Sequence, residues 1–128
     1  MNAITPHLAD QEKLAPLASR YVDVESLPWK PSPYEGVEFK VLMDDPDTGM
    51  QTSLVRFAPG SNLPLHEHVE FEQTWILEGR LVDNEGEATA GNFVWRPGGS
   101  VHVAHAPDGC LLLAFLLKPN RFLEAKDD

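Results

Sequence analysis

An all-β barrel or sandwich is the fold class that this sequence predicts. Its 128 residues include 11 Pro and 9 Gly, an excess of turn residues that favours many short elements. From residue 37 onward, short apolar runs are separated by turn sequences such as DDPDTG, APGSN and PGG. The length suits one compact domain. About nine short strands with this punctuation predict a sheet that closes on itself and leaves few free edges.

The elements are expected in a simple order along the chain. Residues 1–36 are predicted to form an arm that packs on the barrel or on a partner subunit. A short helix is expected at 7–13, and three prolines in LPWKPSPY (27–34) argue against regular pairing there. The barrel is predicted over 37–118, and residues 119–128 are predicted to be a polar tail. Its strands are expected at 37–43, 51–57, 63–68, 72–77, 80–83, 87–89, 93–96, 100–106 and 110–118.

The last of these strands, CLLLAFLLK (110–118), is apolar on both faces, which indicates burial on both sides. One face would line the barrel interior. The other would lie in a subunit interface, which predicts a homodimer, or under the arm.

Charge and composition exclude several classes of partner. Ten Lys and Arg against 20 Asp and Glu give a formal charge of −10, which would repel nucleic acid and anionic membranes. The single Cys110 cannot form an internal disulfide, and residues 1–20 lack the pattern of a signal peptide. No window approaches the roughly 18 consecutive apolar residues of a membrane-spanning helix. We therefore expect a cytoplasmic protein that binds neither nucleic acid nor membrane.

Two histidines in LHEH are the first candidates for a functional site. On a strand, His66 and His68 point to the same face, whereas Glu67 between them points to the opposite face. Glu67 is therefore excluded as their co-ligand.

The following turn selects among the remaining glutamates. If residues 69–71 make a hairpin turn, Glu72 lies directly across from His68, whereas Glu70 sits at the turn tip and points away. Two imidazoles and a carboxylate suit Fe, Zn, Mn, Ni or Co. The alternative is an exposed acidic hairpin that carries two histidines without binding a metal.

The spacing of these residues resembles the two signatures of the cupin superfamily. The first is Gly60-x5-His66-x-His68-x3-Glu72-x6-Gly79, and the second is Gly91-x5-Pro97-x-Gly99-x2-His102. The resemblance covers about residues 37–118 and implies the double-stranded β-helix of that superfamily, a small jelly-roll barrel. It also implies that His66, His68, Glu72 and His102 hold one divalent metal.

The second signature has one departure and one competing residue. Cupins commonly end this motif with Asn, whereas this chain has Ala106, which puts the local packing in doubt but not the metal ligands. His105 is the rival to His102, but on a regular strand it faces the other side. His7, in the arm, is interpreted as a solvated histidine.

Within the superfamily, the stretches YVDVESLPWKP (21–31), GVEFKVLMDDPDTGMQTSLVRFAPGS (36–61) and PDGCLLLAFL (107–116) resemble the cupin domain of the zinc-binding anti-sigma factor ChrR and its stand-alone relatives. Some stand-alone cupins of related type cleave small diketones or hydroxylated ketones with O2 and Fe(II). This resemblance implies a metal-dependent dioxygenase that acts on a small dicarbonyl or enolic compound. Nothing in residues 1–36 resembles a sigma-binding region, so a sigma-factor inhibitor is disfavoured.

Two other functions remain open. One is a non-catalytic zinc-binding module that senses or binds a small ligand. The other is an isomerase or lyase that uses the metal as a Lewis acid. In the dioxygenase or in the isomerase or lyase, Glu72 would either stay bound to the metal or leave it to act as a general base.

A few residues can be placed around the expected pocket. Thr74 and Ile76 share the face of Glu72 and are predicted inside the barrel, whereas Trp75 and Leu77 are predicted outside.

Three further side chains have both a functional and a simpler interpretation. Arg56 or Arg96, if turned inward, would neutralise an anionic substrate, but the surface interpretation is favoured for both. Cys110 is predicted to pack as a small apolar residue.

Overall fold

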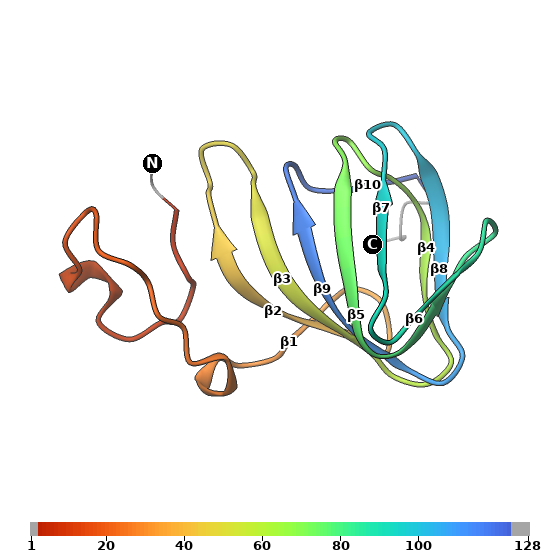
Figure 1. The fold of residues 1–128 in the computed structure, drawn as a ribbon, viewed down its shortest axis with the longest axis horizontal. Coiled ribbons are helices and arrows are strands. Elements are labelled where there is room, and N and C mark those ends of the chain that lie inside the picture. The colour runs from red at the N-terminus through yellow and green to blue at the C-terminus, as the bar shows by residue number, and fades with distance from the viewer. Residues whose placement is uncertain (1–2, 124–128) are drawn as a thin grey trace.

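The computed structural model describes residues 3–123, apart from the side chain of Gln11, and folds into a curled antiparallel β-structure (Figure 1). The all-β, jelly-roll prediction is confirmed. The strands are β1 (Lys30–Pro31), β2 (Val37–Asp44), β3 (Gln51–Phe57), β4 (Ser61–Glu67), β5 (Glu72–Val82), β6 (Glu87–Thr89), β7 (Phe93–Arg96), β8 (Val101–Ala106), β9 (Cys110–Leu116) and β10 (Arg121–Phe122). Within the described range, no helix is long and apolar enough to cross a membrane.

Two curved layers face one another across the core. One layer runs β1-β2-β3-β9-β5, with β7 on the other side of β5, and the second contains β8, β4 and β10 (Figure 1). β5 joins the layers, because its first part pairs with β9 and its last residue in the ladder, Val82, pairs with His105 of β8. Apolar side chains between the layers form the core: Val37, Phe57, Ile76, Leu81, Ala104, Ala106, Cys110, Leu112 and Ala114.

The alternation expected along β5 is confirmed. Thr74 and Ile76 are 3% and 0% exposed, whereas Trp75 and Leu77 are 45% and 43% exposed. One face of β5 therefore lines the barrel and the other faces outward.

The pairing expected between 63–68 and 72–77 is wrong. β4 pairs with β8 and β10, whereas residues 72–76 of β5 pair with β9 and β7, so the two segments lie in different layers. Residues 69–71 carry the chain from one layer to the other instead of closing a hairpin. The residue directly across the ladder from His66 is His102 of β8.

β5 is also one strand where two were expected, at 72–77 and 80–83. Gly79 lies inside it with φ of +74°, next to a bulge between Ile76 and Glu78. A Cβ at position 79 would overlap the carbonyl oxygen of Gly109. Glycine is thus required here for a close backbone approach, not to end the strand.

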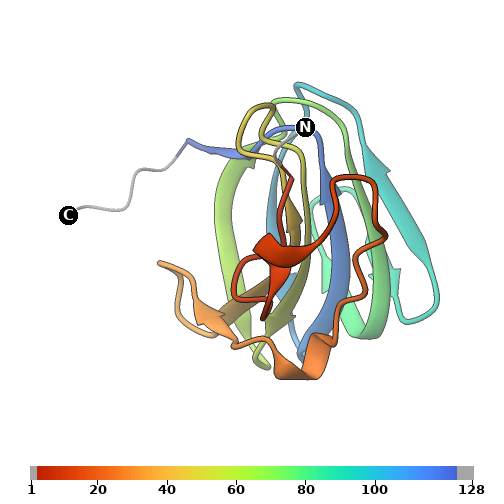
Figure 2. The same cartoon turned by 90° about the vertical axis from the view of Figure 1, so that its left-hand side faces the viewer.

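The arm lies along the outer side of β2 and β3, as the two views in Figures 1 and 2 show. Lys40 Nζ donates a hydrogen bond to the carbonyl of Val24 (2.9 Å), and the Trp29 ring lies 4.1 Å from the Arg56 guanidinium. The short helix expected at 7–13 is reduced to one 3₁₀ turn, Gln11–Lys13, because His7 and Asp10 adopt positive φ.

The proline-rich stretch of the arm forms more regular structure than its sequence led us to expect. A second 3₁₀ turn, Val24–Ser26, precedes β1, whose Lys30 and Pro31 pair with Phe39 and Glu38 at the edge of the sheet. An edge strand tolerates proline because its outward side needs no N–H donor.

Candidate metal centre

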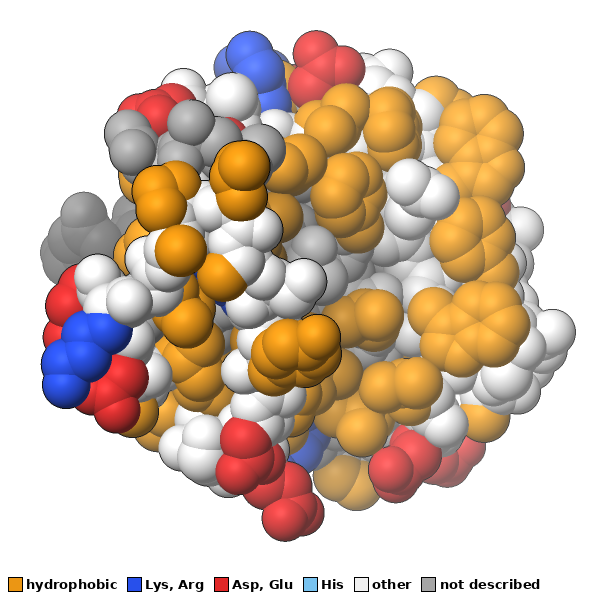
Figure 3. All heavy atoms as spheres, turned by 60° about the vertical axis from the view of Figure 1, so that its left-hand side comes forward, with side chains coloured by type: hydrophobic (Ala, Val, Ile, Leu, Met, Phe, Trp, Pro, Cys, Tyr) orange, Lys and Arg blue, Asp and Glu red, His pale blue; other side chains and the backbone are white. Residues whose placement is uncertain are grey.

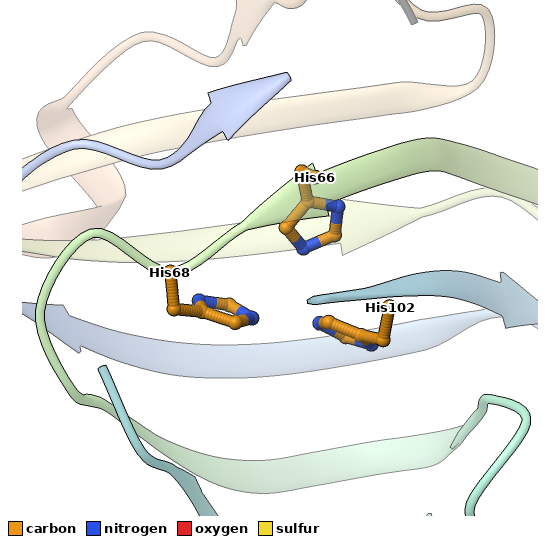
Figure 4. Close-up of side chains that lie close together, drawn as sticks. All are labelled: His66, His68 and His102. Atoms are coloured by element: carbon orange, nitrogen blue, oxygen red, sulfur yellow. The ribbon is translucent and has the colours of Figure 1, made fainter. Parts of the chain in front are cut away.

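Three histidines meet at one end of the barrel (Figure 4). His66 lies on β4, His68 directly follows that strand, and His102 lies on β8 opposite His66. One ring nitrogen from each of the three lies within 4.8 Å of the other two, and the ring centroids are 4.4–5.0 Å apart. All three side chains are buried. Three buried imidazoles arranged in this way could hold a metal ion.

Unpaired ring nitrogens support this interpretation. His68 Nε2 and both ring nitrogens of His102 are buried, and none has a hydrogen-bond partner within residues 3–123. Buried polar atoms are nearly always satisfied, so three orphaned nitrogens in one cluster call for a further ligand. A metal would take one lone pair from each imidazole, through Nε2 of His68 and through one of the two nitrogens of His102.

His66 is held in the tautomer that leaves one nitrogen for a metal. Its Nδ1 lies 2.9 Å from the carbonyl oxygen of Pro64, and a carbonyl can only accept a hydrogen bond. Nδ1 therefore carries the proton and Nε2 keeps its lone pair. A backbone carbonyl on the second nitrogen is a common way to orient a metal-binding histidine.

The three imidazoles are kept neutral near pH 7. Burial, followed by the charges of His66 and Arg96, lowers the pKa of His68 to about 4. Burial together with Arg96 and the neighbouring histidines lowers the pKa of His102 to about 3, and burial also lowers the pKa of His66. Neutral imidazole is the form that binds metals, so protons compete weakly at this site.

Glu72 lies at the edge of the histidine cluster. Its Oε2 is 3.7 Å from His68 Nδ1, and its Oε1 accepts a hydrogen bond from Thr74 (3.3 Å). Burial raises the pKa of Glu72, although Arg96, Asn120 and Thr74 act in the opposite direction. The carboxylate is near the three histidines but is not among the ligand atoms that lie within 4.8 Å of one another.

The other two glutamates of this stretch lie away from the cluster. Glu67 points outward and pairs with Arg121 (2.7 Å), and Glu70 is exposed in the crossover after β4. Strand alternation thus placed Glu67 correctly.

An ion pair that the sequence did not predict lies beside His102. Asp83 Oδ2 lies 2.7 Å from Arg96 Nη1 and 3.4 Å from His102 Nδ1, although the latter contact lacks hydrogen-bond geometry. Asp83 Oδ1 accepts hydrogen bonds from the N–H groups of Glu85 and Gly86. Burial opposes ionisation of Asp83, but these two bonds and Arg96 hold its pKa below the usual value.

Comparison with known proteins assigns the chain to a family. The sequence matches the ChrR cupin-like domain over residues 17–119, which is most of the chain. The chain belongs to the ChrR cupin-like domain family. A comparison with curated proteins found no match.

Three solved structures share the fold of this cupin. A proposed acetylacetone dioxygenase from Methylibium petroleiphilum PM1 is 21% identical, with a TM-score of 0.78 over 87% of this chain and 85% of its own. An acetylacetone dioxygenase from Acinetobacter johnsonii is 20% identical, with a TM-score of 0.76 over 84% and 79%. The anti-sigma ChrR from Rhodobacter sphaeroides, solved in complex with SigE, is 23% identical, with a TM-score of 0.62 over 73% of this chain and 50% of its own. At these identities the likeness establishes the fold alone.

The interior of this cupin contains a cavity of about 300 Å³ that reaches the histidine cluster. Its walls include His66, Glu72 and His102, and the remaining lining is mostly apolar, with side chains from β2, β3, β4, β5, β8, β9 and β10. The polar exceptions are Gln51, Ser53, Thr74 and Asn120. Among the described residues, no Lys or Arg lines the cavity. The space thus suits a small, weakly polar compound next to the histidines.

Arg56 and Arg96, which the sequence could place either inside or outside the barrel, differ in exposure. Arg56 is exposed and pairs with Glu38 (2.7 Å), which confirms the surface interpretation. Arg96 is 8% exposed, so the surface interpretation is wrong for this residue. Its partner Asp83 lies 13 positions earlier in the sequence, and this pairing is what allows the burial.

The other residues that the sequence singled out lie outside the histidine cluster. His105 Nδ1 lies 2.5 Å from Asn62 Oδ1, away from the other three histidines, and His7 is exposed in the arm. Ala106 is fully buried in the core, and its carbonyl accepts a hydrogen bond from Gly60 N–H (2.7 Å). Cys110 also packs in the core, where burial raises the pKa of its thiol to about 11, so it behaves as a small apolar residue as predicted.

Proposed function

We propose that this cupin is an Fe(II)-dependent dioxygenase that acts on a small dicarbonyl or enolic compound, with His66, His68, His102 and Glu72 as metal ligands. The observation that carries the proposal is the mostly apolar cavity of about 300 Å³ whose walls include His66 and His102, two of the three buried histidines that could hold a metal. The two dioxygenases that share the fold are described as acting on acetylacetone, a small dicarbonyl, which agrees with such a cavity.

The roles of the protein groups follow from their surroundings. The histidines supply neutral nitrogens, and Glu72 supplies a carboxylate that reduces the net charge of a bound divalent cation. The chemistry expected from iron in such a site is electron transfer between an enolate and O2. The apolar walls exclude water and orient a small substrate with its oxygens toward the histidines. A substrate with a free carboxylate is disfavoured, since the described lining offers no Lys or Arg to pair with it.

Oxygen uptake tests the proposal. We expect metal-free protein loaded with Fe(II) to consume O2 when acetylacetone and related 1,3-dicarbonyls are added, with no uptake by the Zn(II), Mn(II), Ni(II) or Co(II) forms. Product analysis should show cleavage of the carbon chain. The check is an oxygen electrode on each metal form across a panel of dicarbonyls and hydroxylated ketones.

The alternatives give different results in the same assay. Stoichiometric zinc that resists chelators, with no O2 uptake across the panel, would establish a non-catalytic zinc module. Turnover that persists without oxygen would establish an isomerase or lyase in which the metal acts as a Lewis acid. Either result overturns the dioxygenase proposal.

We also infer that two copies of the chain associate through the outer face of β5 and β7. Large hydrophobic side chains are exposed on this face: Trp75 (45%), Leu77 (43%), Phe93 (47%) and Trp95 (60%). Trp75 and Phe93 are direct neighbours across the ladder, so the patch is contiguous. Hydrophobic side chains also make up much of the surface on the arm side of the molecule (Figure 3). Exposed aromatic patches of this kind often mark interaction surfaces.

Sedimentation tests this interface. We expect the wild-type protein to sediment as a dimer and the Trp75→Glu variant to sediment as a monomer, because a charge buried in the interface is costly. The matched control is Val103→Glu, which alters a similarly exposed apolar residue (40%) on β8. A wild-type protein that stays monomeric at high concentration would contradict the inference.

A further inference from the structure

The segment Pro119–Leu123 forms one wall of the candidate metal centre. Its residues Arg121 and Phe122 form β10, which pairs with Glu67 and His66 of β4. The N–H of Leu123 donates to the carbonyl of Leu65 (3.0 Å), so the segment is bonded to the strand that carries the first histidine. Pro119, Asn120 and Phe122 line the cavity.

Asn120 is the member of this segment that reaches the ligands. Its Oδ1 lies 3.0 Å from His68 Nδ1, and its side chain lies close enough to the carboxyl of Glu72 to counter the rise in the pKa of that carboxyl that burial causes. His68 itself is 0% exposed, and its other nitrogen, Nε2, is one of the orphaned atoms of the cluster. One carboxamide thus lies beside two candidate ligands from different layers of the barrel.

The chemistry of the carboxamide fixes the roles at both contacts. An amide oxygen only accepts, so His68 Nδ1 must carry the proton and Nε2 keeps its lone pair. The amide NH2 only donates, so it suits the nearby carboxylate of Glu72. With oxygen toward His68 and nitrogen toward Glu72, a single orientation satisfies both.

A different tautomer would remove His68 as a ligand through Nε2. The imidazole would then carry its proton on the nitrogen that faces the cluster, and a metal would have to displace it. Groups that orient ligating histidines in this way typically contribute about 10–100-fold to metal affinity.

We propose that Asn120 is a positioning residue of the metal centre, which holds His68 as the Nδ1–H tautomer. The proposal rests on the metal site proposed above. It also couples metal affinity to the docking of Pro119–Leu123, a stretch with no counterpart in either metal-binding signature.

Ring-nitrogen NMR of the metal-free protein tests the tautomer directly. In long-range ¹H–¹⁵N spectra, we expect wild-type His68 to show a protonated Nδ1 and an unprotonated Nε2. In Asn120→Leu, which removes the carboxamide at similar volume, this preference should be lost. Retention of the Nδ1–H form in Asn120→Leu would overturn the proposal whether or not the protein binds metal.

Zn(II) affinity, measured by competition with a chelator, tests the consequence. We expect Asn120→Leu to bind Zn(II) about 10–100-fold more weakly than wild type. Arg121→Ala is the matched control, because it removes the exposed ion pair of the same segment with Glu67 and leaves the amide in place. It should bind Zn(II) like wild type. Equal losses in the two variants would show that docking of the segment matters and the amide does not.

Two further outcomes distinguish the proposed metal site from the proposed role of Asn120. Wild-type protein that binds no divalent metal refutes the metal site while the NMR result still decides the role of Asn120. Should Asn120→Leu fail to fold, Asn120→Ser provides the same comparison with a smaller side chain, and unchanged Zn(II) affinity in that folded variant would overturn the proposal.

Discussion

We expect His66→Ala and His102→Ala each to weaken divalent metal binding by more than about 100-fold, beyond the 10–100-fold typical for loss of a group that only orients a ligand. The two side chains are cross-strand partners with ring centroids 4.4 Å apart, so each variant opens the same cluster from a different strand. Metal content per chain and affinity in competition with a chelator are the measurements.

Two controls come from the same strands. His105→Ala removes a histidine of β8 that contacts Asn62 instead of the cluster, and Glu67→Ala removes a carboxylate of β4 that pairs outward with Arg121. Both should retain wild-type metal content. If His66→Ala or His102→Ala also retained it, the cluster would not be the metal site.

Glu72→Gln separates two ligand sets that share the three histidines. Loss of metal content, at unchanged folding by circular dichroism, supports the carboxylate as the fourth ligand. Unchanged metal affinity would instead mean a three-histidine site, with Glu72 only a neighbour of His68 at 3.7 Å. Glu72 lines the same cavity as His66 and His102, but its carboxylate is not among the ligand atoms that lie within 4.8 Å of one another, so the first set requires its side chain to move.

Alternation along a strand was the most reliable inference from the sequence. It turned His66 and His68 to one face and Glu67 to the other, and it separated buried Thr74 and Ile76 from exposed Trp75. These assignments depend only on the two-residue period of a strand, which holds whichever strand lies alongside.

The identity of the strands that pair with one another could not be inferred in the same way. A short turn after His68 is compatible with a hairpin and with a crossover between layers, and the chain takes the second course. Glu72 nevertheless reaches His68, because the two layers face one another across the barrel. The choice of partner strand depends on packing of the whole domain and not on local turn residues.

Two contributors to the site had no sequence signal. Asn120 contacts His68 across 52 positions, and Asp83 contacts Arg96 across a turn and the short strand β6. Neither residue belongs to a recurring spacing, and an asparagine or aspartate in a turn is common. A buried arginine was therefore unexpected until its partner was known.

We expect Arg96→Met to reduce the free energy of unfolding of the metal-free protein at pH 7 by about 3–5 kcal/mol, the usual cost of removing one partner of a buried ion pair. The side chains of Arg96 and Asp83 are 10% and 7% exposed and lie 2.7 Å apart. Methionine keeps the apolar stem of Arg96 but leaves the Asp83 carboxylate without its counter-charge. Urea unfolding followed by tryptophan fluorescence is the measurement.

The double variant Arg96→Met, Asp83→Asn distinguishes charge from packing. The introduced carboxamide oxygen would still accept the hydrogen bonds from the N–H groups of Glu85 and Gly86, but the side chain would carry no charge, so we expect at least half of the lost stability to return. Arg56→Met, which removes an exposed ion pair with Glu38, should cost only about 1 kcal/mol. An Arg96→Met variant as stable as Arg56→Met would show that Asp83 tolerates burial alone, and that the hydrogen bonds of its turn suffice to hold it beside His102.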